Sequence, residues 1–246
     1  MEEDFGVILN RIGTALRGRD WTAVAIEFAV VVLGIFVALQ AENWNQERTN
    51  RQLEQVYISR LADETRANLS SLKQHEQIFE EKVQFILSLP DLHLDEAIQR
   101  DPNAFIYKLD NSAYVAIPDL RSETYEELES SGRLALLRDA QLRSAIASNL
   151  NDYRSVRPVL SQSIGGYRRL LFETLPGRSY FYFRFGSGDA DSAGITASVE
   201  AFRSDPRFEA AANAEITYGS DMLYWVRVFI RRSEGVLALL EATEER

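Results

Sequence analysis

The sequence contains no cysteine, and only two histidines and six prolines in 246 residues. The lack of cysteine excludes disulfide bonds and thiolate metal sites. Basic residues are the minority, because 27 lysines and arginines stand against 37 acidic residues, a formal net charge of -10. Nucleic-acid binding needs clustered basic side chains, so we expect no nucleic-acid partner. The 46% of hydrophobic residues is that of an ordinary folded chain with a sizeable core.

Only one stretch is apolar enough to cross a membrane, and it reads TAVAIEFAVVVLGIFVALQA from Thr22 to Ala41. Twenty helical residues extend roughly 30 Å, the thickness of the hydrocarbon core of a bilayer. The sequence therefore predicts a transmembrane helix over residues 21–43, in contact with the lipid bilayer. The alternative is a core helix of a soluble protein, because Glu27 leaves an uncharged run of only 28–41.

The flanks of this stretch favour the membrane. Trp21 and Trp44 lie at its two ends, where indole rings contact the headgroup layers, and Arg17 and Arg19 precede it. We expect these four side chains at the membrane interface. The basic residues before the stretch slightly outnumber those close behind it, which favours a cytoplasmic N-terminus.

Residues 1–20 form an amphipathic N-terminal segment, with a stripe of apolar side chains at helical spacing (Phe5, Ile8, Leu9, Ile12 and Leu16). The stripe suits either a helix on the membrane surface or one that packs against the rest of the protein. Acidic residues near the N-terminus and Leu39 at the -3 position of a cut after Ala41 do not fit a signal peptide. We expect an uncleaved anchor.

One face of the predicted span carries Glu27, Gly34, Ala38 and Ala41. Small residues at positions 34 and 38 allow another helix to approach closely. A carboxylate within a span is costly unless it meets a partner or water. The face therefore predicts contact with another membrane protein or with a second copy of the chain. The alternatives are lipid exposure of this face and a Glu27 that reaches the nearby headgroup layer.

Two sequence blocks carry a family resemblance. The first is ALQAENWNQER at residues 38–48, and the second is TYEELESSG at residues 124–132, followed by RLALL. In this order they resemble the signature of an uncharacterised family of bacterial single-pass membrane proteins. The resemblance implies an anchor in the bacterial inner membrane and a helical extramembrane domain, which the expected orientation makes periplasmic. It implies no activity and no catalytic residues.

The region from residue 44 to 246 reads as an extramembrane antiparallel helical bundle, so we predict an all-α protein. The anchor helix is expected to continue past Trp44 as far as Pro90, because apolar residues recur every three or four positions without a proline. Further helices are predicted from an N-cap at Ser122 to Gly132, from Asp139 towards Phe172 with a break at Pro158, and from Pro206 almost to Glu245.

Two places suggest minor extended segments. The first is near residues 105–117, in the pieces Phe105–Tyr107 and Tyr114–Ile117. The second is residues 179–185, SYFYFRF, where phenylalanines alternate with Tyr180, Tyr182 and Arg184. The latter three side chains are candidates for contact with a partner. The alternative is that the phenylalanines simply cover a gap in the bundle.

The sequence shows no catalytic motif. Neither His75 nor His93 has the neighbours that di-iron bundles or metalloproteases require. Asp189, Asp191 and Glu200 match positions 1, 3 and 12 of a calcium loop, but position 5 is Ala193, which has no oxygen ligand. We therefore expect no enzyme activity, no cofactor and no metal, and read residues 189–194 as a flexible loop before a helix.

The favoured function is that of a non-enzymatic interaction protein, either an accessory subunit of a membrane assembly or a homo-oligomeric scaffold. The alternative is a membrane-anchored sensor whose bundle binds a small ligand and relays to another protein. An enzyme is the third and least favoured class, because the many glutamates form no recognisable acid/base pair.

Overall fold

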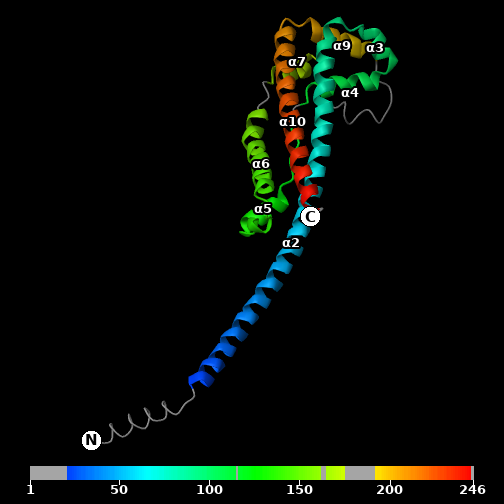
Figure 1. The fold of residues 1–246 in the computed structure, drawn as a ribbon. Coiled ribbons are helices and arrows are strands. Elements are labelled where there is room, and N and C mark those ends of the chain that lie inside the picture. Colours follow the sequence, from blue (N-terminus) through cyan, green and yellow to red (C-terminus); the bar gives the residue numbers. More distant parts are fainter. Residues whose placement is uncertain (1–20, 115, 162–164, 175–191, 245–246) are drawn as a thin grey trace, which may run out of the picture. The chain divides into compact units, whose positions relative to one another are not determined.

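The structure is a computed structural model that describes residues 21–114, 116–161, 165–174 and 192–244. Within these residues all regular elements are helical, which confirms the predicted all-α class (Figure 1). The helices are α2 (Trp21–Ser88), the 3-10 turn η1 (Leu89–Asp91), α3 (Leu94–Arg100), α4 (Pro102–Ser112), α5 (Glu123–Ser130), η2 (Leu134–Leu136), α6 (Ala140–Leu160), α7 (Gly166–Thr174), α9 (Ser192–Ser204) and α10 (Phe208–Glu244).

Helix α2 continues without a break through the predicted anchor and beyond it, as expected from the absence of proline before Pro90. The chain divides into two compact units, residues 1–55 and 56–246. The division lies beyond residue 43, the predicted end of the transmembrane helix. Nearly all side chains of residues 44–53 are exposed, and the first buried side chains are those of Glu54 and Tyr57.

The second unit is an antiparallel bundle built on the C-terminal part of α2 and on α10 (Figure 1). Ion pairs join the two helices in reverse order. Arg66 pairs with Glu241, Lys73 with Glu234, and Lys82 with Glu215. Helices α6 and α7 pack against α10. The predicted antiparallel bundle is therefore confirmed.

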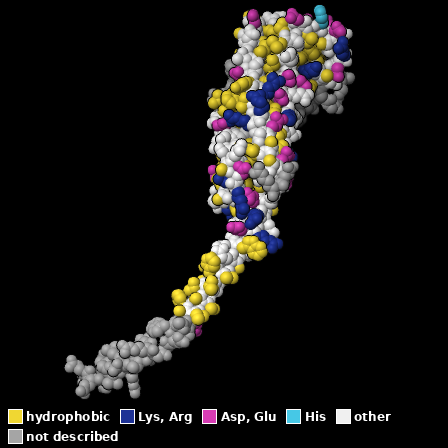
Figure 2. All heavy atoms as spheres, in the orientation of Figure 1, with side chains coloured by type: hydrophobic (Ala, Val, Ile, Leu, Met, Phe, Trp, Pro, Cys, Tyr) yellow, Lys and Arg dark blue, Asp and Glu magenta, His cyan; other side chains and the backbone are white. Residues whose placement is uncertain are grey.

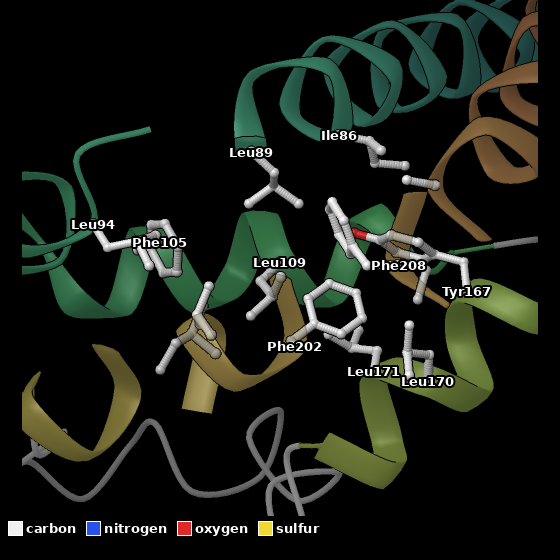
Figure 3. Close-up of a cluster of buried hydrophobic side chains, with 14 of the residues drawn as sticks. Ile86, Leu89, Leu94, Phe105, Leu109, Tyr167, Leu170, Leu171, Phe202 and Phe208 are labelled. Carbon is white, nitrogen blue, oxygen red and sulfur yellow. The ribbon is translucent and has the colours of Figure 1, made fainter. Parts of the chain in front are cut away.

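Among the described residues, three clusters of buried apolar side chains follow one another along this helix pair. One joins residues 57–62 of α2 to α5, the start of α6 and the end of α10. A second fills the middle of the bundle around Phe79, Tyr153 and Phe229. The third holds α3, α4, α7 and α9 together around Phe202 and Phe208, whose rings meet edge to face (Figure 3).

The predicted helices after residue 120 are found close to their expected ends. Helix α5 is followed by Gly132 with a φ of 68°, a backbone conformation that favours glycine. The helix expected from Asp139 towards Phe172 is divided into α6 and α7. Pro158 lies in the last turn of α6 and Gly165, with a φ of 67°, precedes α7.

The predicted extended segment near residues 105–117 is wrong for Phe105–Tyr107, which lie inside helix α4. Asp101 caps this helix by accepting a hydrogen bond from the Ala104 amide, and Pro102 occupies the first turn. Phe105, Ile106 and Leu109 all face the core, as a helix allows. Residues 114, 116 and 117 have an irregular conformation, and the other predicted extended segment, 179–185, lies outside the described residues.

Helices α2 and α10 approach each other closely at Gly219, where an added Cβ would lie 2.8 Å from Cγ2 of Val83. Gly235 of the same helix meets no atom within 4 Å. We expect Gly219→Ala to destabilise the bundle by about 1–3 kcal/mol through overpacking. Gly235→Ala is the matched control and should stabilise it by up to about 1 kcal/mol, because alanine favours helix. Thermal unfolding followed by circular dichroism measures both, and the same sign for both variants would contradict the close approach.

Candidate functional site

The apolar stretch of α2 is exposed. Its large hydrophobic side chains are between 46% and 70% accessible (Ile26, Phe28, Val30, Val31, Val32, Leu33, Ile35, Phe36, Val37 and Leu39). Figure 2 shows hydrophobic side chains along this part of the helix. Of the described helices, α2 alone is long and apolar enough to cross a membrane, judged by length and composition.

The predicted contact face of this helix is accessible as well. Glu27, Gly34, Ala38 and Ala41 are all exposed, and their spacing places them on one side of α2. A Cβ added at Gly34 meets no atom within 4 Å. Larger side chains at these positions therefore fit within the described structure.

Several predicted site residues lie outside the described residues. These are Arg17, Arg19, Tyr180, Tyr182, Arg184, Asp189 and Asp191, together with the side chain of Trp21. Trp44, the other predicted interface residue, is 69% exposed.

The calcium-loop alternative disagrees with the conformation of its second part. Residues 192–200 correspond to positions 4–12 of the calcium-loop template, so the structure describes most of the backbone of this loop. They are helical, because α9 begins at Ser192, and Glu200 lies well inside that helix. The predicted start of this helix near Ile195 is three residues late.

A set of hydrogen bonds clamps the second family block onto α2. Four side chains of α2 at helical spacing, Tyr57, Arg60, Glu64 and Asn68, bind residues 121–127. The spacing of three, four and four residues puts them on one face of the helix. We call these residues and their bonds the α2 clamp.

Asn68 holds the chain just before α5. Its Nδ2 donates to the carbonyl oxygen of Arg121 at 2.9 Å, and its Oδ1 accepts from the Arg121 amide at 2.8 Å. Both ends of a buried side-chain amide are thus satisfied by one backbone residue. The segment that enters α5 is thereby fixed relative to α2.

Glu64 caps α5 from outside. Its Oε1 accepts hydrogen bonds from the Thr124 amide, at 3.0 Å, and from the Thr124 hydroxyl. A carboxylate at this end of a helix also meets the positive end of the helix dipole. Ser122 stands at the predicted N-cap position but makes no capping bond, since its hydroxyl donates to Glu126 instead.

Glu127 completes the clamp. Its Oε1 accepts from the Tyr57 hydroxyl at 2.8 Å and its Oε2 from Arg60 at 2.7 Å. The hydrogen bond from Arg60, and then that from Tyr57, lower the pKa of the Glu127 carboxyl below its ordinary value. In the same block Leu128 is fully buried. The second family block therefore has a structural role, which is to hold α5 against α2.

A buried ion pair lies further along the same helix. Lys82 Nζ donates to Glu215 Oε1 at 2.5 Å and to the carbonyl oxygen of Tyr114 at 2.6 Å, and both charged side chains are at most 2% exposed. The nitrogen also lies 5.3 Å from the centroid of the Tyr218 ring. Burial lowers the pKa of Lys82, and the charge of Glu215 opposes this effect.

Sequence reasoning missed both the clamp and the buried pair. The clamp residues lie three or four positions apart, between the apolar residues of α2. Polar residues with that spacing usually form a solvated helix face, so this pattern does not by itself predict bonds within the protein. Their common spacing was a signal, but their partners lie more than 50 residues away in the chain. Lys82 and Glu215 are separated by 133 residues, and no local pattern joins them.

Comparison with known proteins gives a family and no activity. The model of a family of unknown function, DUF6090, matches residues 27–165, more than half of the chain. The match includes most of the apolar stretch and both sequence blocks. No curated protein and no solved structure matches the chain. The expectation of an uncharacterised family is confirmed, and the chain belongs to the DUF6090 family of unknown function.

Proposed function

We propose that this protein is a non-enzymatic interaction protein that α2 anchors in a membrane, as an accessory subunit of a membrane assembly or as a homo-oligomeric scaffold. The exposure of the apolar side chains from Ile26 to Leu39 carries the proposal. A helix that is apolar all round is stable in lipid or against other helices, and unstable in water. A core helix of a soluble protein would bury these side chains, so the observation favours a span.

The face with Glu27, Gly34 and Ala38 is the proposed contact with another membrane protein or with a second copy. Small residues four positions apart let helix backbones approach and gain packing energy in lipid. The Glu27 carboxylate would meet a polar group of that partner, because an unpaired charge in a span is costly. Open space around Gly34 supports this assignment.

The test is association in the membrane. We expect Gly34→Leu combined with Ala38→Leu to reduce co-purification or crosslinking about tenfold, or about 1.4 kcal/mol. Ala25→Leu with Ala29→Leu is the matched control, because these exposed alanines have the same spacing on the opposite face of α2. The measurement is tagged purification from native membranes in mild detergent, with mass spectrometry of stoichiometric partners.

Each outcome of this purification decides one part of the proposal. A defined partner that the Gly34 variant loses and the alanine variant keeps supports an accessory subunit. Copies of the chain alone support a scaffold. Elution as a monomer, or equal losses in both variants, would contradict association through this face.

We also propose that the membrane is the bacterial inner membrane, with the N-terminus in the cytoplasm and the bundle in the periplasm. The excess of arginine before the span supports this orientation. Because the chain has no cysteine, single-cysteine variants can be labelled without background. We expect a membrane-impermeant maleimide to label Ser59→Cys in cells with a permeabilised outer membrane, and Thr14→Cys only after lysis. The reverse pattern would overturn the orientation.

A sensor is the second candidate because the bundle contains a pocket of about 380 Å3 with polar and apolar walls. Gln84 and Ser88 of α2 and Lys108 and Asn111 of α4 line it. Glu81 lines the same pocket, so a small polar ligand with a negative charge would bind on the side of Lys108. A rise in melting temperature with succinate or citrate that Lys108→Ala abolishes would favour this function, and no shift with either would disfavour it.

A further inference from the structure

The side-chain amide of Asn149 is half satisfied. Its Nδ2 donates to the Ser233 hydroxyl oxygen at 3.1 Å, whereas Oδ1 has no hydrogen-bond partner among the described residues. Asn149 is only 8% exposed and Ser233 only 1%. A buried acceptor without a donor is rare in folded proteins, and it usually indicates an occupant that supplies the missing hydrogen bond.

Asn149 lines a small cavity of about 30 Å3 beside the α2 clamp. Residues of α2, α6 and α10 and of the segment that enters α5 form its walls, with the polar residues Glu64, Asn68 and Ser233 among them. One water needs roughly 10–15 Å3 of such space and two to four polar partners. The cavity is therefore large enough for one water, and too small for an organic ligand.

The polar residues that line the cavity supply both the hydrogen-bond acceptors and the hydrogen-bond donors that a water molecule needs. Oε1 of Glu64 is bound by Thr124, and its other carboxylate oxygen accepts no hydrogen bond from the described residues. The Ser233 hydroxyl accepts from Asn149, so it retains its own hydrogen to donate. Arg121 binds Oδ1 of Asn68 and one of its two Nδ2 hydrogens, so the second Nδ2 hydrogen is a further donor at this wall.

We propose that this cavity binds one internal water molecule, which donates to Asn149 Oδ1 and to Glu64 and accepts from the Ser233 hydroxyl. The water thereby joins α2, α6 and α10 at the point where the second family block is clamped. A metal cation fits these groups less well, because Glu64 is the one carboxylate among the described residues that line the cavity. Moreover, no group of three or more acidic or histidine side chains in the described residues is placed to hold a metal ion.

Diffraction from crystals of the full chain in lipid tests the proposal directly. We expect one peak of water-like density about 2.7–3.2 Å from Asn149 Oδ1. A soak with thallium(I) should give no anomalous signal there. An empty cavity, a thallium peak, or an Asn149 amide turned so that Nδ2 donates to Glu64 would overturn it.

Replacement of Asn149 gives a second, independent readout. Asn149→Leu expels the water and leaves Glu64 and Ser233 without their bonds, so the melting temperature should fall by about 2–6 °C. Asn213→Leu on the exposed face of α10 is the control and should shift it by less than about 1–2 °C. If the cavity is empty, leucine removes the unsatisfied acceptor together with the hydrogen bond to Ser233, and these two effects oppose each other. The melting temperature should then change by less than about 2 °C, which contradicts the proposal.

Discussion

Replacing Lys82 with methionine is expected to destabilise the helical bundle by about 3–5 kcal/mol, which lowers the melting temperature by about 10 °C. The reason is the burial of the partner. Glu215 is 2% exposed, so the variant leaves an uncompensated carboxylate in the core, and the Tyr114 carbonyl also loses its donor. Glu215→Leu should cost a similar amount, because it leaves the Lys82 ammonium buried without a counter-charge.

The double variant Lys82→Met, Glu215→Leu should recover most of this loss. Removing both charges also removes the cost of holding either one in a low dielectric, so buried pairs are often replaced with little net change. We expect the double variant within about 1–2 kcal/mol of the wild type, the remainder being the unpaired Tyr114 carbonyl. Chemical or thermal unfolding of the four proteins provides the double-mutant cycle.

The exposed pair of Lys73 and Glu234 is the matched control, since it joins the same two helices at 2.9 Å. Both side chains are about half exposed, so solvent screens them and Lys73→Met should cost less than about 1 kcal/mol. A Lys82→Met variant as stable as Lys73→Met would show that the Lys82 pair is hydrated and not buried.

Two lysines in the apolar stretch should release the protein from the membrane. Val32 and Phe36 lie near its centre, on the side of α2 opposite Gly34 and Ala38. Each lysine costs about 2.5–3.5 kcal/mol at the centre of a span, so the pair costs about 5–7 kcal/mol. After alkaline carbonate extraction, we expect the Val32→Lys, Phe36→Lys variant in the supernatant and the wild type in the membrane pellet.

The matched control places the same charges on exposed apolar residues of the bundle. Val159 and Tyr224 are 67% and 61% exposed, so Val159→Lys with Tyr224→Lys should alter neither the fold nor the membrane fraction. Equal extraction of both double variants would point to an effect on folding, and retention of the Val32 variant in the pellet would contradict a span.

Much of the fold was predictable because local signals decide it. The proline-free run up to Pro90 yields the long α2, and Gly132 with its left-handed backbone follows the end of α5. The segment at Phe105–Tyr107 was predicted wrongly because three apolar residues in a row suit a strand as well as a helix. The Asp101-Pro102 start signal, which selects the helix, lies just upstream.

The candidate sites also divide into those that local signals reveal and those that depend on contacts between distant parts of the chain. The exposed face of Glu27, Gly34 and Ala38 follows from helical periodicity within a single element, and sequence reasoning located it. Glu64, by contrast, caps a helix 60 residues away, and Asn149 meets Ser233 across 84 residues. No local preference encodes such pairs.

The sequence by itself determined the all-α class, the single long apolar helix and the family, since periodicity, length and short motifs are local properties of a chain. Only the tertiary structure decided that the second family block is clamped to α2, that Lys82 and Glu215 are buried together, and that one acceptor of Asn149 lacks a protein donor. These features depend on which helices pack against one another, and burial then turns ordinary polar side chains into costly groups that need specific partners.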